Sequence, residues 1–342
     1  MSGKRQMARV LIAMGLLVAM LAFGFGVYQA AEHLRAARND VRRPTEVRAP
    51  SIPGTLYVVQ NGAIYRLQKG SFKQITDESG WMQPSAAPNN QLVAVRRQGN
   101  YSDMYLLSDA GAAVAQLTHD ESKTAVASNH WVFYPRFAPD GKSVFYSFDP
   151  KDIYGSYKLD LTIFASHVDA RSRAIVWTTP NAYTGGDVSP VPLRSGALIY
   201  TKYSIDDSAQ VHSQIWIQRR AGSPGLALTP VSMGCSQPAV SSDETAIVMV
   251  CDRGSNQHSD LVAAPLDESA LTIGAPTTLV GEQLVASPAF SPDGKTVAFL
   301  APDAAGGHFQ LWSVPAAGTA PAKSVTDNLD LDSDSAPVWL AG

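Results

Sequence analysis

The sequence is poor in charge and in cysteine, and it has no excess of basic residues. Charged residues make up 17% of its 342 positions, the formal net charge is −3 and there are two cysteines. Proteins that bind nucleic acid usually have a basic surface, so this composition argues against a nucleic-acid partner. The chain also lacks the GxSxG, HExxH, P-loop and CxxC motifs, so it carries no standard catalytic signature.

Charge is absent altogether from Val10 to Ala31, a stretch long enough to cross a bilayer as a helix. A cleaved signal peptide is the alternative, because a basic segment from Lys4 to Arg9 precedes the apolar stretch. The cleavage position is unsuitable, since Gln29 or Tyr28 would lie where the peptidase requires a small residue. We therefore expect a membrane anchor at residues 10–31 after a short cytoplasmic tail at residues 1–9.

Residues 32–54 are expected to form a stalk, because a segment of helix-forming composition is followed by Pro44, Pro50 and Pro53. Arginines flank the apolar stretch on both sides, so charge counting alone does not decide the topology. The tail is too short to be a domain and the two cysteines look paired, which favours an extracytoplasmic position for the large domain. The sequence thus predicts a single-pass membrane protein whose large domain lies in the periplasm or on the cell surface.

From residue 55 onward the sequence repeats about every fifty residues. In each copy a Pro begins an apolar strand, a polar turn follows, and a second β-rich run comes next. The copies begin at Pro84, Pro135, Pro190, Pro238 and Pro288, with a truncated copy at Pro337. Two more strand-like runs complete each repeat. Four strands in a repeat of this length are typical of a β-propeller blade.

The two ends of the repeated region complement each other. Residues 55–76 contain three strand-like runs without the first strand of a blade, and Pro337 to Leu340 supplies a first strand without its followers. Joining them closes a ring and leaves neither end strand exposed. The sequence therefore predicts an all-β domain at residues 55–342, a six-bladed β-propeller of four-stranded antiparallel blades.

The turns of two repeats carry a more specific motif. Ser291–Phe299 reads SPDGKTVAF and Ala138–Tyr146 reads APDGKSVFY, and each is followed downstream by a Leu-Thr-like strand ending. These residues resemble the TolB-type, WD40-like propeller repeat, and the resemblance covers the whole globular part. The motif is degenerate at Leu193–Gly196 and at Ser242–Glu244. TolB has an α/β domain before its propeller where this chain has the expected anchor, so the resemblance implies the fold but not TolB's own role.

Cys235 and Cys251 lie just before the first strand and at the end of the second strand of the fifth blade. If the hairpin turns at Asp243-Glu244, the two cysteines face each other across the ladder, and a disulfide is geometrically reasonable. Two buried free thiols are the alternative. The disulfide would staple one blade and would suit an oxidising compartment.

No group of residues in the sequence stands out as a catalytic site. Six-bladed propellers can carry metal-dependent lactonase or esterase sites in their channels, and the residues that could contribute here are His130, His167, Asp187, His212, His258 and His308. Because they are spread over different blades, we expect these six residues to lie in loops or at the channel rim and not to form a site.

The carboxylates Asp327, Asp330, Asp332 and Asp334 lack the Gly and distal Glu of an EF-hand and are typical of a solvated loop. We expect no cofactor; Asp330, Asp332 and Asp334 are the weak candidates for a Ca²⁺ site.

Aromatic residues gather near the expected entrances of the blades, at Trp81, Trp131, Tyr134, Tyr183 and Trp339. If exposed, they would form a patch for a protein partner; the alternative is that they pack between blades.

The leading hypothesis is a membrane-anchored extracytoplasmic module that binds another protein or an envelope polymer. A metal-dependent hydrolase that uses the central channel and a structural subunit of a membrane complex are the alternatives.

Overall fold

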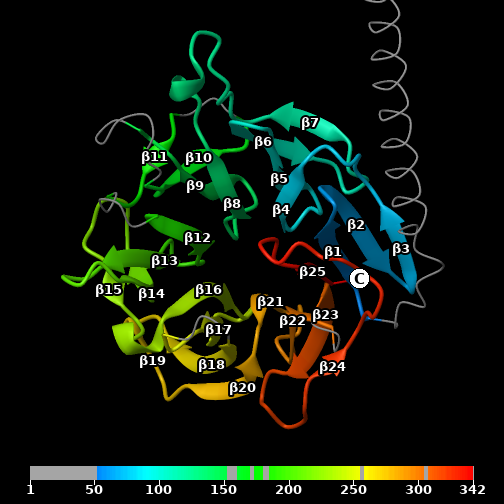
Figure 1. Ribbon diagram of the computed structural model, residues 1–342, viewed down its shortest axis with the longest axis vertical. Coiled ribbons are helices and arrows are strands. Elements are labelled where there is room, and N and C mark those ends of the chain that lie inside the picture. The colour runs from blue at the N-terminus through cyan, green and yellow to red at the C-terminus, as the bar shows by residue number, and fades with distance from the viewer. Residues whose placement is uncertain are drawn as a thin grey trace, which may run out of the picture. The chain divides into compact units, whose positions relative to one another are not determined.

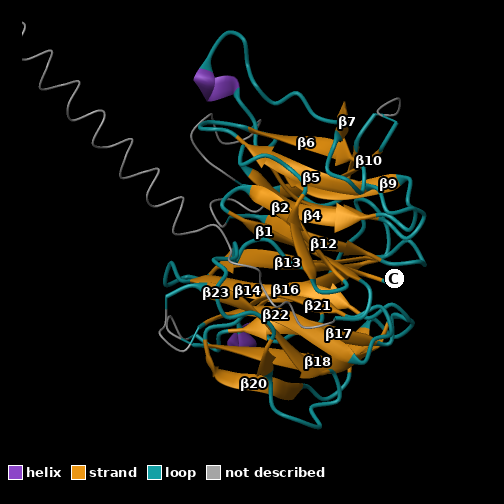
Figure 2. Ribbon diagram, turned by 90° about the vertical axis from the view of Figure 1, so that its right-hand side faces the viewer, coloured by secondary structure: helices purple, strands orange, loops and turns teal. Residues whose placement is uncertain are grey.

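Six antiparallel sheets follow one another around a central channel and form a six-bladed β-propeller (Figure 1). The structure is a computed structural model that describes residues 52–151, 160–169, 173–179, 185–254, 258–303 and 307–341. Strands and loops make up nearly all of these residues (Figure 2), and the helical elements among them are the short turns η1 (Val126–Ser128) and η2 (Val231–Met233). The all-β class and the six blades predicted from the repeat are confirmed.

In the first three blades, as in the others, the first strand lies beside the channel and the last lies outside (Figure 1). Blade one contains β25 (Val338–Leu340), β1 (Thr55–Gln60), β2 (Ala63–Gln68) and β3 (Ser71–Gln74). Blade two contains β4 (Trp81–Ala86), β5 (Leu92–Arg97), β6 (Ser102–Leu107) and β7 (Ala113–Gln116). Blade three contains β8 (Val132–Phe137), β9 (Ser143–Phe148), β10 (Thr162–His167) and β11 (Ile175–Val176).

The remaining blades keep this order, with an addition in blade five. Blade four contains β12 (Asp187–Pro192), β13 (Leu198–Ile205), β14 (Val211–Gln218) and β15 (Leu226–Ala227). Blade five contains β16 (Cys235–Val240), β17 (Ala246–Cys251), β18 (Ser259–Asp267), β19 (Thr272–Ile273) and β20 (Thr277–Gln283). Blade six contains β21 (Ala286–Phe290), β22 (Thr296–Pro302), β23 (Phe309–Pro315) and β24 (Lys323–Ser324). Because β18 is nine residues long, it pairs with β19 near its end and with β20 along the rest of the same edge.

The ring closes in blade one, where β25 pairs with β1 in the register Thr55↔Leu340 and Tyr57↔Val338. Six hydrophobic clusters hold the blades together, one at each interface between neighbouring blades. At the closing interface, Leu56 and Val58 of blade one pack with the cluster that includes Leu300 of blade six. The core is therefore continuous around the ring, and β25 completes it.

The Leu-Thr-like pairs that end the repeats have a structural role. In five blades, a Thr hydroxyl after the outermost strand accepts a hydrogen bond of 2.9–3.0 Å from a backbone N–H of the third strand, which in blade one is β2. These residues are Thr76, Thr118, Thr178, Thr229 and Thr326. Each bond satisfies a backbone donor at the point where the fourth strand leaves the ladder.

The candidate membrane anchor at residues 10–31 and the tail at residues 1–9 lie outside the described residues, as does most of the stalk. Within the described ranges, no helix is long and apolar enough to cross a membrane.

Candidate functional site

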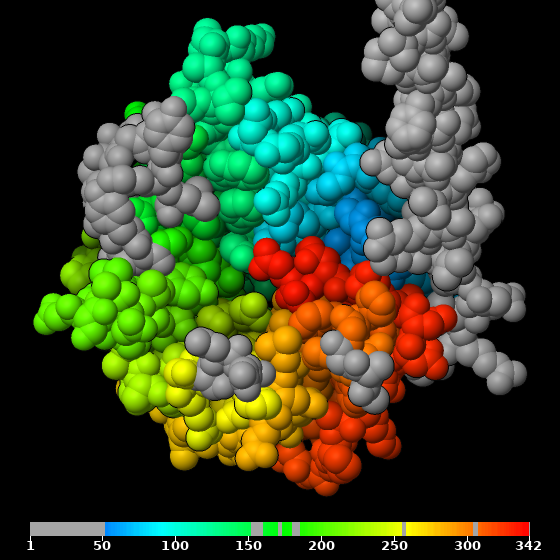
Figure 3. Space-filling view, in the orientation of Figure 1, coloured from blue at the N-terminus to red at the C-terminus, as the bar shows by residue number. Residues whose placement is uncertain are grey.

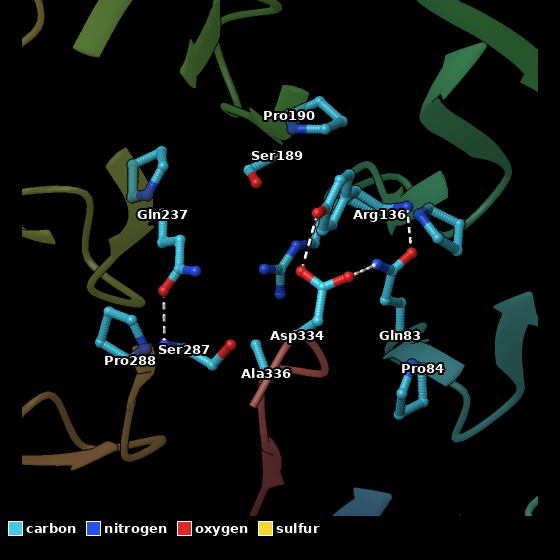
Figure 4. Close-up of a pocket in the computed structure, with 13 residues that line it drawn as sticks. Gln83, Pro84, Arg136, Ser189, Pro190, Gln237, Ser287, Pro288, Asp334 and Ala336 are labelled. Atoms are coloured by element: carbon cyan, nitrogen blue, oxygen red, sulfur yellow. Dashed lines mark hydrogen bonds between the residues drawn. The ribbon is translucent and has the colours of Figure 1, made fainter. Parts of the chain in front are cut away.

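The central channel holds two adjoining cavities. The mouth cavity, near the start of the first strands, has a volume of about 50 Å³ (Figure 4). Every blade contributes to it the residue before the proline of its first strand: Gln83, Tyr134, Ser189, Gln237, Ser287 and Ala336. The inner cavity, of about 230 Å³, lies further along the same strands and shares Arg136 and Pro288 with the mouth cavity.

A backbone irregularity places these side chains in the channel. Five of the six, all except Ala336, have φ between 51° and 54°, a conformation that is uncommon outside glycine. The register of the first two strands shifts at the same point in each of these five blades. Such a bulge redirects a side chain, and here it gives the mouth cavity a ring of polar and aromatic groups.

Side chains of this ring bond to the neighbouring blade. The Gln83 Oε1 atom accepts a hydrogen bond of 2.7 Å from the backbone N–H of Tyr134. The Gln237 Oε1 atom accepts one of 2.6 Å from the backbone N–H of Ser287. Because each backbone N–H is a donor, the amide Nε2 atom of both glutamines must face away from that bond. The two glutamines therefore present amide donors to the channel from opposite parts of the ring.

A carboxylate from the loop before β25 occupies one side of the mouth cavity. The Tyr134 hydroxyl donates to Asp334 Oδ1 at 2.7 Å, and Gln83 Nε2 donates to Asp334 Oδ2 at 3.0 Å. Burial raises the pKa of Asp334, and these two donors act in the opposite direction. The loop, red in Figure 3, reaches the middle of this face. Asp334 thus ties the closing segment to blades two and three.

Arg136 of β8 is the charged side chain shared by the two cavities. In Figure 4 its guanidinium group points into the mouth cavity. Among the described residues it makes no hydrogen bond and no ion pair, and burial lowers its pKa. A guanidinium group stays protonated in proteins, so the mouth cavity contains a positive charge, and Asp334, the carboxylate that also lines this cavity, makes no ion pair with it.

Beside the mouth cavity lies a stack of three side chains from blades two and three. The Trp131 and Phe133 rings are parallel to within 8° with centroids 5.8 Å apart, and the Arg97 guanidinium lies 5.7 Å from the Trp131 centroid. Trp131 and Phe133 are partly exposed and Arg97 is exposed. Tyr134 adjoins the stack, with its ring centroid 6.2 Å from that of Phe133. We call Arg97, Trp131 and Phe133 the aromatic stack.

The structure separates the other aromatic candidates from this surface. Trp81 is 5% exposed and packs between blades one and two, so it follows the alternative of packing between blades and is not part of an exposed patch. Trp339 of β25 packs against the closing interface and donates its indole N–H to the carbonyl of Pro53. Tyr183 lies outside the described residues. Of the candidates for partner binding, Trp131 and Tyr134 are thus the partly exposed residues at the mouth.

The acidic loop distributes its carboxylates among different partners. Asp330 pairs with His308 at 3.0 Å, and Asp332 accepts hydrogen bonds from the Asp334 N–H and the Ser335 hydroxyl within its own loop. Asp334 points across the channel mouth, and Asp327 is exposed. In the described part of the chain, no group of three or more His, Cys, Asp or Glu residues is arranged to hold a metal ion. The expected lack of a cofactor and its weaker alternative, a Ca²⁺ site on Asp330, Asp332 and Asp334, both stay predictions.

The candidate channel residues lie elsewhere than the two cavities. His130 stacks on Phe148, and His167 lies at the exposed end of β10. The buried Asp187 forms an ion pair with Lys202, and His212 bonds to Asp206. His258 lies in an exposed loop, and His308 pairs with Asp330. The structure does not bring these six residues together.

The Sγ atoms of Cys235 and Cys251 are bonded in the structure, and the two residues are direct partners in the β16–β17 register. Both side chains are fully buried. In the described residues of blade five, no threonine makes the strand-end bond seen in the other five blades. The disulfide joins the two inner strands of blade five, and the first of them, β16, carries the channel residue Gln237.

The buried carboxyl group of Asp120, in the loop after β7, should make the stability of the protein depend on pH. Burial is the main cause that raises the pKa of this carboxyl to about 6, and its Oδ2 atom has no hydrogen-bond partner among the described residues. The folded state then binds more protons than the unfolded state between about pH 4 and 6, so stability falls as pH rises through this window. We expect Asp120→Asn to raise the free energy of unfolding at pH 7.5 by up to about 3 kcal/mol.

The measurement is urea unfolding of both proteins at pH 7.5 and pH 4. The difference between them should shrink at pH 4, where the wild-type carboxyl is protonated in the folded state. An equal difference at the two pH values would show that charge at Asp120 is not the cause.

These observations define the class of protein: a six-bladed β-propeller with a polar channel mouth and a partly exposed aromatic stack beside it. Among solved structures, the fold is similar to TolB from Acinetobacter baumannii, with a TM-score of 0.62 and 18% identity over 84% of this chain and 67% of that one. It is also similar to a putative TolB from Agrobacterium tumefaciens, with a TM-score of 0.57 and 14% identity over 84% of this chain and 94% of that one.

A gluconolactonase from Xanthomonas campestris has the fold as well, with a TM-score of 0.54 and 13% identity over 84% of this chain and 90% of that one. No family model and no curated protein matches the sequence. The TolB-type propeller fold inferred from the SPDGK repeats is confirmed, and at these identities the similarity establishes the fold alone.

The channel residues Gln83, Ser189, Gln237 and Arg136 were missed by the sequence reasoning. The signal for three of them was present, because each precedes one of the prolines that mark the repeat. Aligning the copies on the proline places these residues at one level of the ring. Arg136, which follows Pro135, is the charged residue at that position among the complete copies, where Ser85, Val191, Ala239 and Ala289 stand in the other blades.

Proposed function

We propose that this protein is a membrane-anchored extracytoplasmic binding module whose propeller docks another protein at the channel mouth. The aromatic stack is the observation that carries the proposal. Trp and Arg are enriched among residues that dominate binding energy, and here they lie stacked and accessible at the rim of the channel. The structural similarity to TolB propellers supports a binding role by analogy of fold.

The arrangement is suited to docking because it is already ordered. The Phe133 ring stacks on the Trp131 ring, and the Arg97 guanidinium lies at cation–π distance from the same Trp131 ring. A partner that buries this stack would lose little side-chain freedom on binding, since the rings are held in place before contact. Membrane anchoring through residues 10–31 would hold the propeller close to partners in the same envelope.

The test is gentle detergent extraction of the tagged full-length chain, followed by identification of the proteins that co-purify. We expect a specific partner whose recovery falls at least about tenfold with Trp131→Ala, which corresponds to 1.4 kcal/mol. Phe72→Ala is the matched control, because it removes an aromatic ring stacked on Tyr65 at the outer strand β3. Equal recovery with both variants would contradict the proposal, as would recovery of the chain alone with a metal in its channel.

A further inference from the structure

Three polar groups without internal acceptors converge in the mouth cavity (Figure 4). They are the guanidinium group of Arg136 in blade three, the hydroxyl of Ser189 in blade four and the Nε2 amide of Gln237 in blade five. In the described part of the chain, none of these donors is hydrogen-bonded to an acceptor. All three can donate, and Arg136 adds a full positive charge. This side of the cavity favours an anion, because the Asp334 carboxylate on the other side is already bound by Gln83 and Tyr134.

The orientation of Gln237 is fixed by the fold. Its Oε1 atom accepts the hydrogen bond from the backbone N–H of Ser287 at 2.6 Å. The Nε2 atom is therefore the end directed at the channel, as Figure 4 shows. Reversal of the amide would place two N–H groups against the backbone donor of Ser287, which excludes that rotamer.

The opposite side of the same cavity shows which anion this geometry suits. Gln83 is equivalent to Gln237: each precedes the proline of its first strand, each has φ near 51–52°, and each accepts from the next blade's backbone. The Gln83 Nε2 atom donates to a carboxylate, that of Asp334, at 3.0 Å. A hydroxyl, that of Tyr134, donates to the second oxygen of this carboxylate. The protein thus contains an internal example of an amide and a hydroxyl holding one carboxylate.

We propose that Arg136, Ser189 and Gln237 form a carboxylate-binding site in the mouth cavity, in which the guanidinium group supplies the charge that balances the ligand. Arg136 pairs with one or both carboxylate oxygens, and Ser189 and Gln237 each donate one hydrogen bond. The mouth cavity of about 50 Å³ holds the carboxylate, and the inner cavity of about 230 Å³ can take the rest of the molecule. The ligand is a small carboxylic acid or the carboxylate of a peptide, and the site does not depend on docking at the aromatic stack.

The experiment measures thermal unfolding of the full-length chain in increasing sodium acetate or sodium succinate, with sodium chloride keeping the ionic strength constant. A ligand that binds only the folded state raises the midpoint. We expect this rise for the wild type and for Arg219→Gln, which removes the same charge from an exposed position bonded to the carbonyl of Ser269. Arg136→Gln should weaken carboxylate binding at least tenfold. Its midpoint without carboxylate should be no lower than that of the wild type, because Arg136 has no internal bond to lose.

A second variant separates binding from folding. Gln237→Glu keeps an acceptor for the Ser287 N–H and places a carboxylate beside Arg136, so it should raise the midpoint in the absence of ligand and abolish the response to acetate. Tetraalanine with a free or an amidated C-terminus distinguishes a peptide carboxylate from a small carboxylic acid as the ligand. If the midpoint rises with free-acid tetraalanine but not with the amide, the ligand is a peptide carboxylate. If it rises with acetate or succinate but not with tetraalanine, the ligand is a small acid. No response to any of these carboxylates in the wild type, or an equal response in Arg136→Gln, would overturn the proposal.

Discussion

Deletion of residues 337–342 should leave the propeller largely unfolded or aggregated. The deletion removes β25, and with it the pairing to β1, the packing of Trp339 at the closing interface, and the packing of Val338 and Leu340 between blades one and two. Burial of a large apolar side chain is worth about 1.5–3 kcal/mol, so the loss is roughly 4–6 kcal/mol with partial exposure allowed for. A loss of this size is comparable to the whole stability of many proteins, about 5–15 kcal/mol.

The deletion also leaves β1 as an unprotected edge. Unpaired backbone donors and acceptors on an edge strand promote association between chains. We therefore expect the deleted protein to elute as large species in size-exclusion chromatography and to lose its cooperative thermal transition. The control removes only Ala341 and Gly342, which follow β25, and should behave as the wild type. A monomeric deletion protein with an unchanged unfolding midpoint would show that β25 does not hold the ring.

Replacement of both cysteines by alanine should lower the free energy of unfolding by about 3 kcal/mol under oxidising conditions. The bridge joins residues 16 positions apart, and a loop of about this length removes that much entropy from the unfolded chain. Because the unfolding entropy is about 2.1 cal/mol/K per residue, the unfolding midpoint of a domain of this size should fall by roughly 5 °C. The effect is concentrated in blade five, where the bridge connects β16 to β17.

Reductant provides the control for the disulfide. Dithiothreitol should lower the midpoint of the wild type to that of Cys235→Ala/Cys251→Ala and should leave the double variant unchanged. A wild-type midpoint that is the same with and without dithiothreitol would show that the bridge does not contribute to stability.

The fold could be predicted from the sequence because its signals are local and repeated. The turn at Pro139 to Gly141 is one example: Gly141 has a positive φ, and the Asp140 carboxylate accepts from the backbone N–H groups of Lys142 and Ser143. Each such turn fixes a hairpin without reference to the rest of the chain. The ring closure followed from counting strands at the two ends, since a blade without its first strand needs one from elsewhere.

Blade five shows the limit of that reasoning for the fold. Its repeat departs from four strands because β18 is long enough to pair with both β19 and β20. The spacing of prolines is insensitive to such a change, since the extra pairing occurs at the outer edge. Strand pairing there depends on the lengths of β18 and its connections rather than on a motif.

The candidate site was harder to predict because it is assembled from several blades. Gln83 and Gln237 are ordinary strand residues in the sequence, and their positions in the channel depend on a bulge with a left-handed backbone before a proline. Residues before proline usually favour extended conformations, so local preference pointed the other way. That Arg136 forms no ion pair among the described residues is visible only once the ring brings its neighbours together.

The central claim, that the channel mouth docks another protein, is tested most directly by photo-crosslinking from the aromatic stack. A photoreactive phenylalanine placed at Trp131 in the full-length chain should crosslink to one partner protein in the native cell, and the same group placed at Phe72 should not. Crosslinking of equal yield at both positions, or none at Trp131 while the protein is folded, would contradict the account.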